Sequence, residues 1–253
     1  MISRKELEKE ADRLKYSAGQ SEKDFFQHLF LSALYEITAS EFIFKGGTAL
    51  QKIWGLGRFS EDIDFNYRGI LGQQSKIMEL AKELMNRIYE TEAYVANRKQ
   101  NSVSYKFKIK GPLYVGRPLS ICSITVDISW REGISLEPRV FSVVPRYTAL
   151  RPYTLSSMAI EEILAEKIRA LLTRTAARDL YDVWFLLSKG IQIDYLLIDQ
   201  KLKLYGRKFD LEGLLDALQA RRRHWIMELQ PLVSSLPEFQ EVLEVVESGL
   251  RGR

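Results

Sequence analysis

Residues 45–65 read KGGTALQKIWGLGRFSEDIDF. A short apolar run, Glu41–Phe44, precedes the glycine pair, and a glycine pair at a strand end lets the backbone turn tightly or approach a ligand. Thr48–Trp54 has a helical pattern that ends at Gly55. In Asp62–Phe65 polar and apolar side chains alternate, as they do in a half-buried strand. The stretch therefore predicts strand, turn, helix and strand in succession, which is the nucleus of an α+β fold.

The rest of the chain divides into a mixed part and a helical part. Helical spacing extends over Ile2–Leu14, over a segment from an expected N-cap at Ser21 to Thr38, and over Gln73–Tyr89. Strand patterns cover Ala93–Asn97, Val103–Ile109, Ser120–Ile128 and Phe141–Val144. After Pro152 no strand pattern returns, and helical spacing continues from Ile160–Leu172 through Asp179–Ser188 to two or three further helices. We therefore predict an α/β domain with N-terminal helices over residues 1–151 and an all-helical domain over residues 152–253.

Composition narrows the class of protein. Hydrophobic residues make up 46% and charged residues 28% of the 253 residues, which is typical of a globular protein. The net charge of +4 suits a nucleotide or nucleic-acid partner without requiring one. No stretch approaches the roughly 20 apolar residues of a membrane span. The charged N-terminus lacks the apolar core of a signal peptide. We expect a cytoplasmic protein with no membrane partner.

Few residues can hold a soft metal ion. Cys122 is the only cysteine, and His28 and His224 are the only histidines, so an intramolecular disulfide and cysteine-based zinc sites are excluded. Both histidines are expected to be structural. A metal ion would have to be held by carboxylates, which favours Mg²⁺ or Mn²⁺.

Three aspartates are the candidate metal ligands. Asp62 and Asp64 are two positions apart on a strand, so both side chains point the same way, and the like charges repel unless a cation neutralises them. The alternative without a functional role is a solvated strand edge with two acids, and the nearby glycine pair disfavours it. Asp127 lies in another alternating segment, Ile124–Trp130. It is a candidate third ligand for two-ion phosphoryl chemistry, or an ordinary outward-facing acid.

The glycine turn is the candidate phosphate site. The N–H groups of Gly46 and Gly47 can bind phosphate oxygens at the positive end of the following helix, and Thr48 adds a hydroxyl. Ser60 either hydrogen-bonds a phosphate or caps its turn. Arg58 either binds a triphosphate oxygen or forms a salt bridge with the first aspartate of the pair.

Together, these motifs resemble those of DNA polymerase β-like nucleotidyltransferases: a glycine–hydroxyl turn, a D-x-D strand and a distant third aspartate. A closer resemblance is to the AbiEii/AbiGii toxin family of nucleotidyltransferases, carried by Lys45–Leu50, Arg58–Phe65, Glu162–Lys167 and Arg178–Asp182. One departure is Gly-Gly-Thr where many members of the superfamily have Gly-Ser, but threonine keeps the hydroxyl. The resemblance implies a palm-like mixed sheet flanked by helices, followed by a helical bundle.

The resemblance also implies roles for individual residues. Asp62, Asp64 and Asp127 are expected to bind metal, and Lys167 to neutralise charge on the leaving phosphates. The expected nucleotide-binding residues are Gly46, Gly47, Thr48, Ser60, Lys45, Arg58, Arg178, Asp179 and Asp182. From the residues alone, the charges around Lys167 are equally well explained as exposed helix pairs worth about 0.3–0.5 kcal/mol each, and Arg174 as part of a solvated face.

The predicted activity is metal-dependent transfer of a nucleoside monophosphate from a nucleoside triphosphate to an acceptor. The resemblance implies RNA, specifically tRNA, as the acceptor, and a toxin of a type IV toxin–antitoxin or abortive-infection system with a cognate antitoxin. Two alternatives stay open: transfer to a protein or a small molecule, and a catalytically silent module that binds a nucleotide or a partner. The basic run Arg221–Arg223 is better explained as a helix exterior than as an RNA contact.

Overall fold

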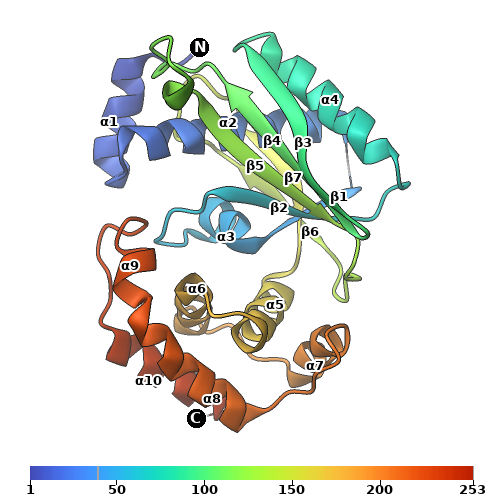
Figure 1. Cartoon of the computed structure of the whole chain (residues 1–253), viewed down its shortest axis with the longest axis vertical. Coiled ribbons are helices and arrows are strands. Elements are labelled where there is room, and N and C mark those ends of the chain that lie inside the picture. Colours follow the sequence, from blue (N-terminus) through green and yellow to red (C-terminus); the bar gives the residue numbers. More distant parts are fainter. Residues whose placement is uncertain (39, 253) are drawn as a thin grey trace. The chain divides into compact units, whose positions relative to one another are not determined.

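The computed structural model describes residues 1–38 and 40–252. The chain forms two compact units, and their elements can be followed in Figure 1. The first unit consists of Met1–Gly55, Phe59–Gly133 and Pro138–Ser157. The second consists of Leu56–Arg58, Ile134–Glu137 and Met158–Arg253. Two short stretches that precede β7 (Tyr153–Ser157) in the sequence therefore belong to the same unit as the C-terminal helices.

The first unit is built on a mixed sheet. Within the described residues the sheet has seven strands in the order β3-β4-β5-β2-β1-β7-β6. Their bounds are β1 Phe42–Lys45, β2 Asp62–Tyr67, β3 Thr91–Lys99, β4 Ser102–Ile109, β5 Cys122–Ser129, β6 Arg139–Val143 and β7 Tyr153–Ser157. Strand β2 pairs antiparallel with β1 and parallel with β5. The α+β class predicted from the sequence is confirmed.

Helices flank this sheet, and the second of them begins earlier than predicted. The helices of the first unit are α1 Arg4–Leu14, α2 Ala18–Ile37, α3 Gly46–Trp54, α4 Gln73–Asn86 and the short 3-10 helix η1 Pro118–Ser120. Ser17 is the N-cap of α2 and forms a capping box with Gln20. The predicted N-cap at Ser21 is wrong: Ser21 lies one turn inside the helix, where its hydroxyl donates to the carbonyl of Leu7.

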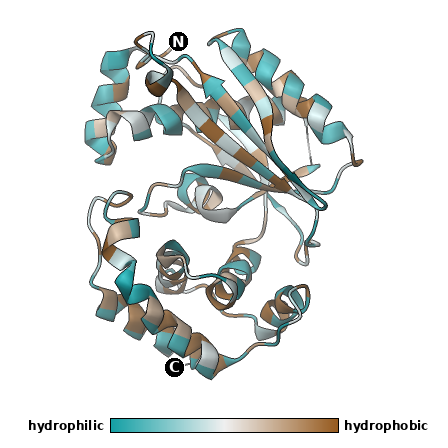
Figure 2. Cartoon of the chain, viewed as in Figure 1, coloured by the Kyte–Doolittle hydropathy of each residue, from teal (hydrophilic) through white to brown (hydrophobic). Residues whose placement is uncertain are grey.

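The sheet has one apolar face and one polar face. Along β4 and β5 buried and half-buried residues alternate strictly, and Figure 2 shows the matching alternation of hydropathy. On the apolar face Phe107 packs edge-on against Phe30 of α2, with ring centroids 5.0 Å apart. Tyr105 hydrogen-bonds Ser75 of α4 on the same face. Helices α2 and α4 therefore cover the apolar face, and the opposite side chains of β4 and β5 are polar.

Strand β7 departs from the sequence-based prediction. The prediction that no strand follows Pro152 is wrong, because Tyr153–Ser157 pairs with β6 and β1 and extends the sheet beyond the domain boundary predicted after residue 151. Its two buried serines hide the strand pattern. Long-range hydrogen bonds satisfy them: the Ser157 hydroxyl donates to the carbonyl of Phe44, and Tyr35 donates to the carbonyl of Ser156.

The second unit is a helical bundle. Its helices are α5 Ile160–Thr173, α6 Ala177–Ser188, α7 Tyr195–Lys203, α8 Leu211–Ala220, the 3-10 helix η2 Arg221–Arg223, α9 Trp225–Leu229 and α10 Phe239–Leu250. After α6 the described chain thus holds four α-helices, where two or three were predicted. None of the described helices has the length and apolar character needed to cross a membrane.

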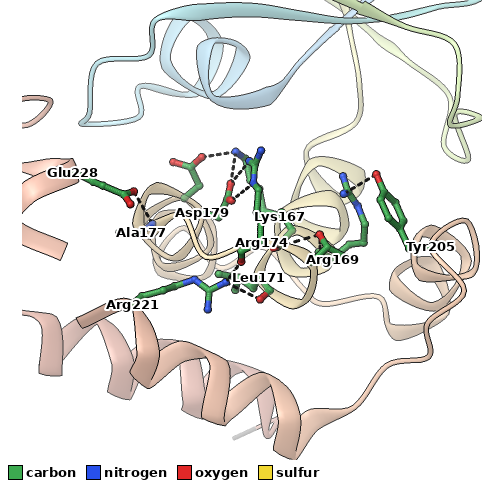
Figure 3. Close-up of polar contacts among 12 residues, drawn as sticks. Lys167, Arg169, Leu171, Arg174, Ala177, Asp179, Tyr205, Arg221 and Glu228 are labelled. Atoms are coloured by element: carbon green, nitrogen blue, oxygen red, sulfur yellow. Dashed lines mark hydrogen bonds and ion pairs between the residues drawn. The ribbon is translucent and has the colours of Figure 1, made fainter. Parts of the chain in front are cut away.

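Buried charged residues, Glu162, Lys201 and Arg221, join parts of this bundle. The carboxylate of Glu162 accepts hydrogen bonds from the backbone N–H groups of Ser135 and Leu136, at 2.9 Å each, and from Lys201. This explains why residues 134–137 belong to the helical unit. Arg221 donates to the carbonyl of Leu171 at 2.6 Å, as Figure 3 shows, and is itself buried. The first arginine of the basic run is therefore a structural residue.

Candidate active site

The glycine pair begins α3 directly, without an intervening loop. The sequence placed the start of this helix at Thr48, but the helix starts at Gly46, so the N–H groups of Gly46 and Gly47 are among those that no carbonyl of the helix satisfies. Gly46 has a φ of +75°, a conformation that favours glycine. A Cβ placed on Gly46 would lie 2.4 Å from Oδ2 of Asp64. The carboxylate of Asp64 therefore lies directly against the glycine turn.

The three predicted metal ligands share one face of the sheet. Asp62 and Asp64 are half-buried on β2 and alternate with buried Ile63 and Phe65. Asp127 is half-buried on β5, where it is the register partner of Asp64. Neighbouring strands lie about 4.8 Å apart, so these two carboxylates start from adjacent backbone positions. The structure thus brings the D-x-D pair and Asp127 to one surface.

The chemistry of these donors suits a hard divalent ion. Among the side chains that the structure describes, no three His, Cys, Asp or Glu residues already form a cluster that could hold a metal ion. Mg²⁺, however, is commonly bound by one or two carboxylates, with the other positions filled by water and substrate phosphates. Asp62 and Asp64 supply such a pair beside the glycine turn. The residues present therefore fit Mg²⁺ or Mn²⁺ bound together with a nucleotide.

The backbone that leads into β2 is fixed by hydrogen bonds. The hydroxyl of Thr48 is fully buried and donates to the carbonyl of Asp62, which joins the glycine turn to the D-x-D strand. Gln27 of α2 donates to the carbonyls of Ser60 and Glu61, at 2.9 Å each. Gln51 of α3 accepts from the N–H of Ser60 at 3.1 Å. The phosphate contacts predicted for Thr48 and Ser60 stay predictions.

Neither Gln27 nor Gln51 was predicted from the sequence to support the site. Gln27 is fully buried on α2. A polar residue at a core position of a helix signals a specific hydrogen-bond partner, since burial without one is costly. The sequence contained this signal, but it could not identify the partner, because the carbonyl of Ser60 lies 33 residues away along the chain.

Three of the predicted nucleotide-binding residues, Arg58, Asp179 and Asp182, form a charge network with Lys167 and Arg174 inside the helical unit. Arg58 makes a bidentate ion pair with Asp182, with two N–O distances of 2.7 Å. Nζ of Lys167 lies 2.7 Å from Oδ2 of Asp182 and 3.1 Å from Oδ1 of Asp179. Arg174 completes the network by binding both oxygens of Asp179, at 2.6 and 2.8 Å; Figure 3 labels Lys167, Arg174 and Asp179.

This network corrects several sequence-based interpretations. Arg58 makes a buried bidentate pair with Asp182, a partner that the sequence did not suggest. Lys167 is buried, so its alternative explanation as part of an exposed helix pair is wrong. Arg174 is not simply solvated, because it is paired with a fully buried carboxylate. Arg178 is half-buried on α6, and Lys45 is the register partner of Asp64. Their triphosphate contacts, like those of the network, stay predictions.

The pKa values in the network follow from burial and pairing. Burial alone would raise the pKa of Asp179 and Asp182, but the cations around them more than offset burial and hold both below the ordinary value. Burial alone would lower the pKa of Lys167, whereas the two aspartates raise it above its ordinary value. All three groups are therefore charged at neutral pH.

We expect this network to make the protein sensitive to acid. Folding depresses the pKa of such a carboxylate. It therefore stabilises the folded state fully at pH values above the pKa of the unfolded chain, about 3.9, and this stabilisation is lost as the pH falls through the pKa of the folded state. Lys167 has the opposite sign: its contribution is lost only as the pH rises past about 10.4. Asp179→Asn should therefore show a smaller loss of unfolding free energy between pH 6 and pH 3 than the wild type. Urea titrations at each pH measure this, and equal losses would contradict it.

Comparison with known proteins places the chain in a family. The model of the family described as the nucleotidyl transferase AbiEii toxin of type IV toxin–antitoxin systems matches residues 30–245. A search of curated proteins found no match.

Solved structures agree on the fold. MenT4, a nucleotidyltransferase toxin from Mycobacterium tuberculosis H37Rv, is similar with a TM-score of 0.72 at 19% identity, over 99% of this chain and 89% of that one. JHP933 from Helicobacter pylori has a TM-score of 0.63 at 17% identity, over 93% and 92% of the two chains. A structure described as a putative nucleotidyltransferase from H. pylori has a TM-score of 0.62 at 18% identity, over 90% of this chain and 92% of that one. On the evidence of its motifs, its fold and the family match, the chain belongs to the AbiEii family of nucleotidyltransferase toxins.

Proposed function

We propose that this protein transfers a nucleoside monophosphate from a nucleoside triphosphate to a hydroxyl group of an acceptor RNA, with Mg²⁺ or Mn²⁺ as the cofactor. The position of the Asp64 carboxylate against Gly46 at the start of α3 is the observation that carries the proposal. It puts an acid that can bind a cation beside N–H groups that can bind a phosphate. A nucleoside triphosphate bound with its metal ion needs both.

The nucleotide is held by backbone and side chain together. The N–H groups of Gly46 and Gly47, at the positive end of α3, donate to phosphate oxygens. Asp62 and Asp64 hold the metal ion, which when bound neutralises phosphate charge and makes the acceptor hydroxyl easier to deprotonate. The buried hydroxyl of Thr48 keeps the D-x-D strand in place relative to the turn.

The reaction exchanges one P–O bond for another. The acceptor hydroxyl oxygen forms a bond to the α-phosphorus, the bond from that phosphorus to the bridging oxygen of the β-phosphate breaks, and pyrophosphate leaves. The hydroxyl proton passes to the carboxylate of Asp127, next to Asp64 on the polar face. Most of the rate enhancement would come from positioning and electrostatics.

A transfer assay tests the proposal. The protein is incubated with Mg²⁺, total cellular RNA and each of the four nucleoside triphosphates labelled at the α-phosphate. Label on RNA that is lost on chelation of the metal is the expected result. Label on protein or on a small molecule would replace RNA as the acceptor. Bound nucleotide without any transfer would identify a silent binding module and contradict the proposal.

Replacing Gly46 tests the turn itself. Gly46→Ala forces alanine into a φ of +75° and puts its Cβ 2.4 Å from the Asp64 carboxylate, so we expect most transfer to be lost. Gly55→Ala is a matched control: its φ is +76°, and nothing lies within 4 Å of the added Cβ. Both variants should lose about 1–2 kcal/mol of stability from backbone strain. Equal transfer activity in the two variants would show that Asp64 is not held by this turn for catalysis.

We propose further that the activity makes the protein a toxin with a cognate antitoxin, in line with the type IV system of its family. Induced expression of the wild type in bacteria should arrest growth, and Asp62→Asn should not, because it removes the negative charge that binds the metal ion without changing the size of the side chain. Colony counts after induction, at matched protein levels on a blot, measure this. Arrest by both proteins would separate toxicity from the D-x-D site.

A further inference from the structure

The polar face of the sheet continues beyond the three aspartates. Register partners on neighbouring strands point to the same face, so the pairings define rows of side chains across the sheet. One row runs from Asp62 through Thr125 and Lys106 to Tyr94. The acids thus stand at one end of the row, and a lysine and a tyrosine at the other. Three strand spacings, about 14 Å, separate β2 from β3.

The far end of this row is an aromatic and basic surface. Tyr94 is 45% exposed on β3. Nζ of Lys108, which is on the same face of β4 as Lys106, lies 5.4 Å from the centre of the Tyr94 ring. The two lysines outnumber Glu92, the register partner of Lys108, so this part of the face is net positive.

Ordinary structural roles explain these side chains poorly. Lysines often protect a sheet edge from pairing with another chain, but β4 lies inside the sheet, between β3 and β5. The apolar face of β4 packs on α2 and α4, so Lys106 and Lys108 lie opposite the core. In Figure 1, β3, β4 and β5 lie in front of α2. An exposed tyrosine beside two lysines, on the face that leads to the three aspartates, suggests a ligand that has both aromatic rings and negative charge.

We propose that Tyr94, Lys106 and Lys108 form a platform for the single-stranded end of the acceptor RNA. A sheet-borne aromatic ring stacks on an unpaired base, and lysines beside it neutralise the phosphates on either side. The strand would run along the row towards Asp62, which brings its terminal hydroxyl to the three acids. This inference rests on the proposed nucleotidyl transfer, since it identifies where that reaction holds its acceptor.

Direct binding tests the platform without relying on catalysis. The affinity of the full-length protein for a fluorescent single-stranded oligoribonucleotide is measured by anisotropy at several salt concentrations. Tyr94→Ala should weaken binding roughly tenfold to hundredfold because the stacked base loses its partner, whereas Tyr94→Phe keeps the ring and should bind like the wild type. The double variant Lys106→Ala, Lys108→Ala should weaken binding and make the slope of log affinity against log salt shallower by about 1.4.

A matched pair of lysines controls for net charge. Lys5 and Lys9 are exposed on α1, and replacing both by alanine removes the same formal charge as the platform variant. That control should leave both affinity and salt slope unchanged. Thermal unfolding of each variant confirms that it is folded. Wild-type affinity in Tyr94→Ala, or equal effects of the two lysine pairs, would overturn the platform.

The transfer assay then separates the two proposals. Variants that bind RNA weakly and raise the KM for RNA, while the KM for nucleoside triphosphate is unchanged, support the platform. Transfer to RNA that none of the platform variants affects would keep the proposed function and remove the platform. RNA binding that depends on Tyr94, without any transfer by the wild type, would keep the platform as an RNA-binding surface and overturn the proposed function. Transfer only to protein would overturn RNA as the occupant.

Discussion

Asp64→Asn is expected to reduce nucleotidyl transfer by on the order of a thousandfold, because several kcal/mol of charge stabilisation by the metal ion depend on its ligands. Asparagine keeps the size of the side chain and thus the contact with Gly46, but removes the negative charge that binds the cation. Steady-state rates of label transfer, with the wild type and variant at saturating nucleotide, measure the effect.

Two further variants make this result specific. Asp12→Asn changes an exposed aspartate on α1 in the same compact unit and should transfer at the wild-type rate. Asp127→Asn should also be strongly impaired, because Asp127 is the register partner of Asp64 and the proposed proton acceptor. A variant at Asp64 that retains activity within about tenfold of the wild type would show that this carboxylate does not hold the essential metal.

Asp182→Ala is expected to destabilise the protein by about 3–5 kcal/mol, since removing one partner of a buried ion network leaves uncompensated charges. Asp182 is fully buried and is paired with Arg58 and Lys167, which are themselves buried. Taking the carboxylate away leaves both cations with less compensation in a site from which water is excluded. Urea unfolding monitored by circular dichroism measures the loss.

An exposed ion pair is the control for that prediction. Glu8 pairs with Arg4 on α1, where the two side chains are 49% and 61% exposed, so Glu8→Ala should cost no more than about 1 kcal/mol. Replacing the cations together with the acid, as Arg58→Met, Lys167→Met and Asp182→Leu, should recover part of the lost stability. If Asp182→Ala is no more costly than Glu8→Ala, the network is not a structural element of the helical unit.

The sequence predicted the placement of the candidate site residues along their strands more completely than the fold around them. Local alternation was enough to put Asp62 and Asp64 on one side of a strand, and to do the same for Asp127, because strand periodicity depends only on neighbouring residues. The adjacency of Asp64 and Asp127 in a parallel pair could not be predicted, because strand order is set by tertiary packing. The same holds for β7, whose buried serines depend on partners more than 100 residues away.

The buried charges show the same limit. Arg58 stands four residues before the D-x-D motif, so the sequence suggested a local partner and could not reveal the carboxylate of Asp182 on α6, 124 residues away. The residues around Lys167 and Arg174 have the spacing of a solvated helix face, and only tertiary contacts reveal that they meet buried aspartates. Charge pattern along a chain reports the residue types available for pairing, and packing decides which of them pair.

The most direct test is to follow the α- and γ-phosphates of the same nucleotide separately. The protein is given Mg²⁺, RNA and a nucleoside triphosphate labelled at either position. The account predicts that α-label becomes attached to RNA while γ-label appears only in pyrophosphate, in equal amounts and both dependent on Asp62 and Asp64. Attachment of γ-label to the acceptor, or α-label transfer that survives loss of both aspartates, would contradict it.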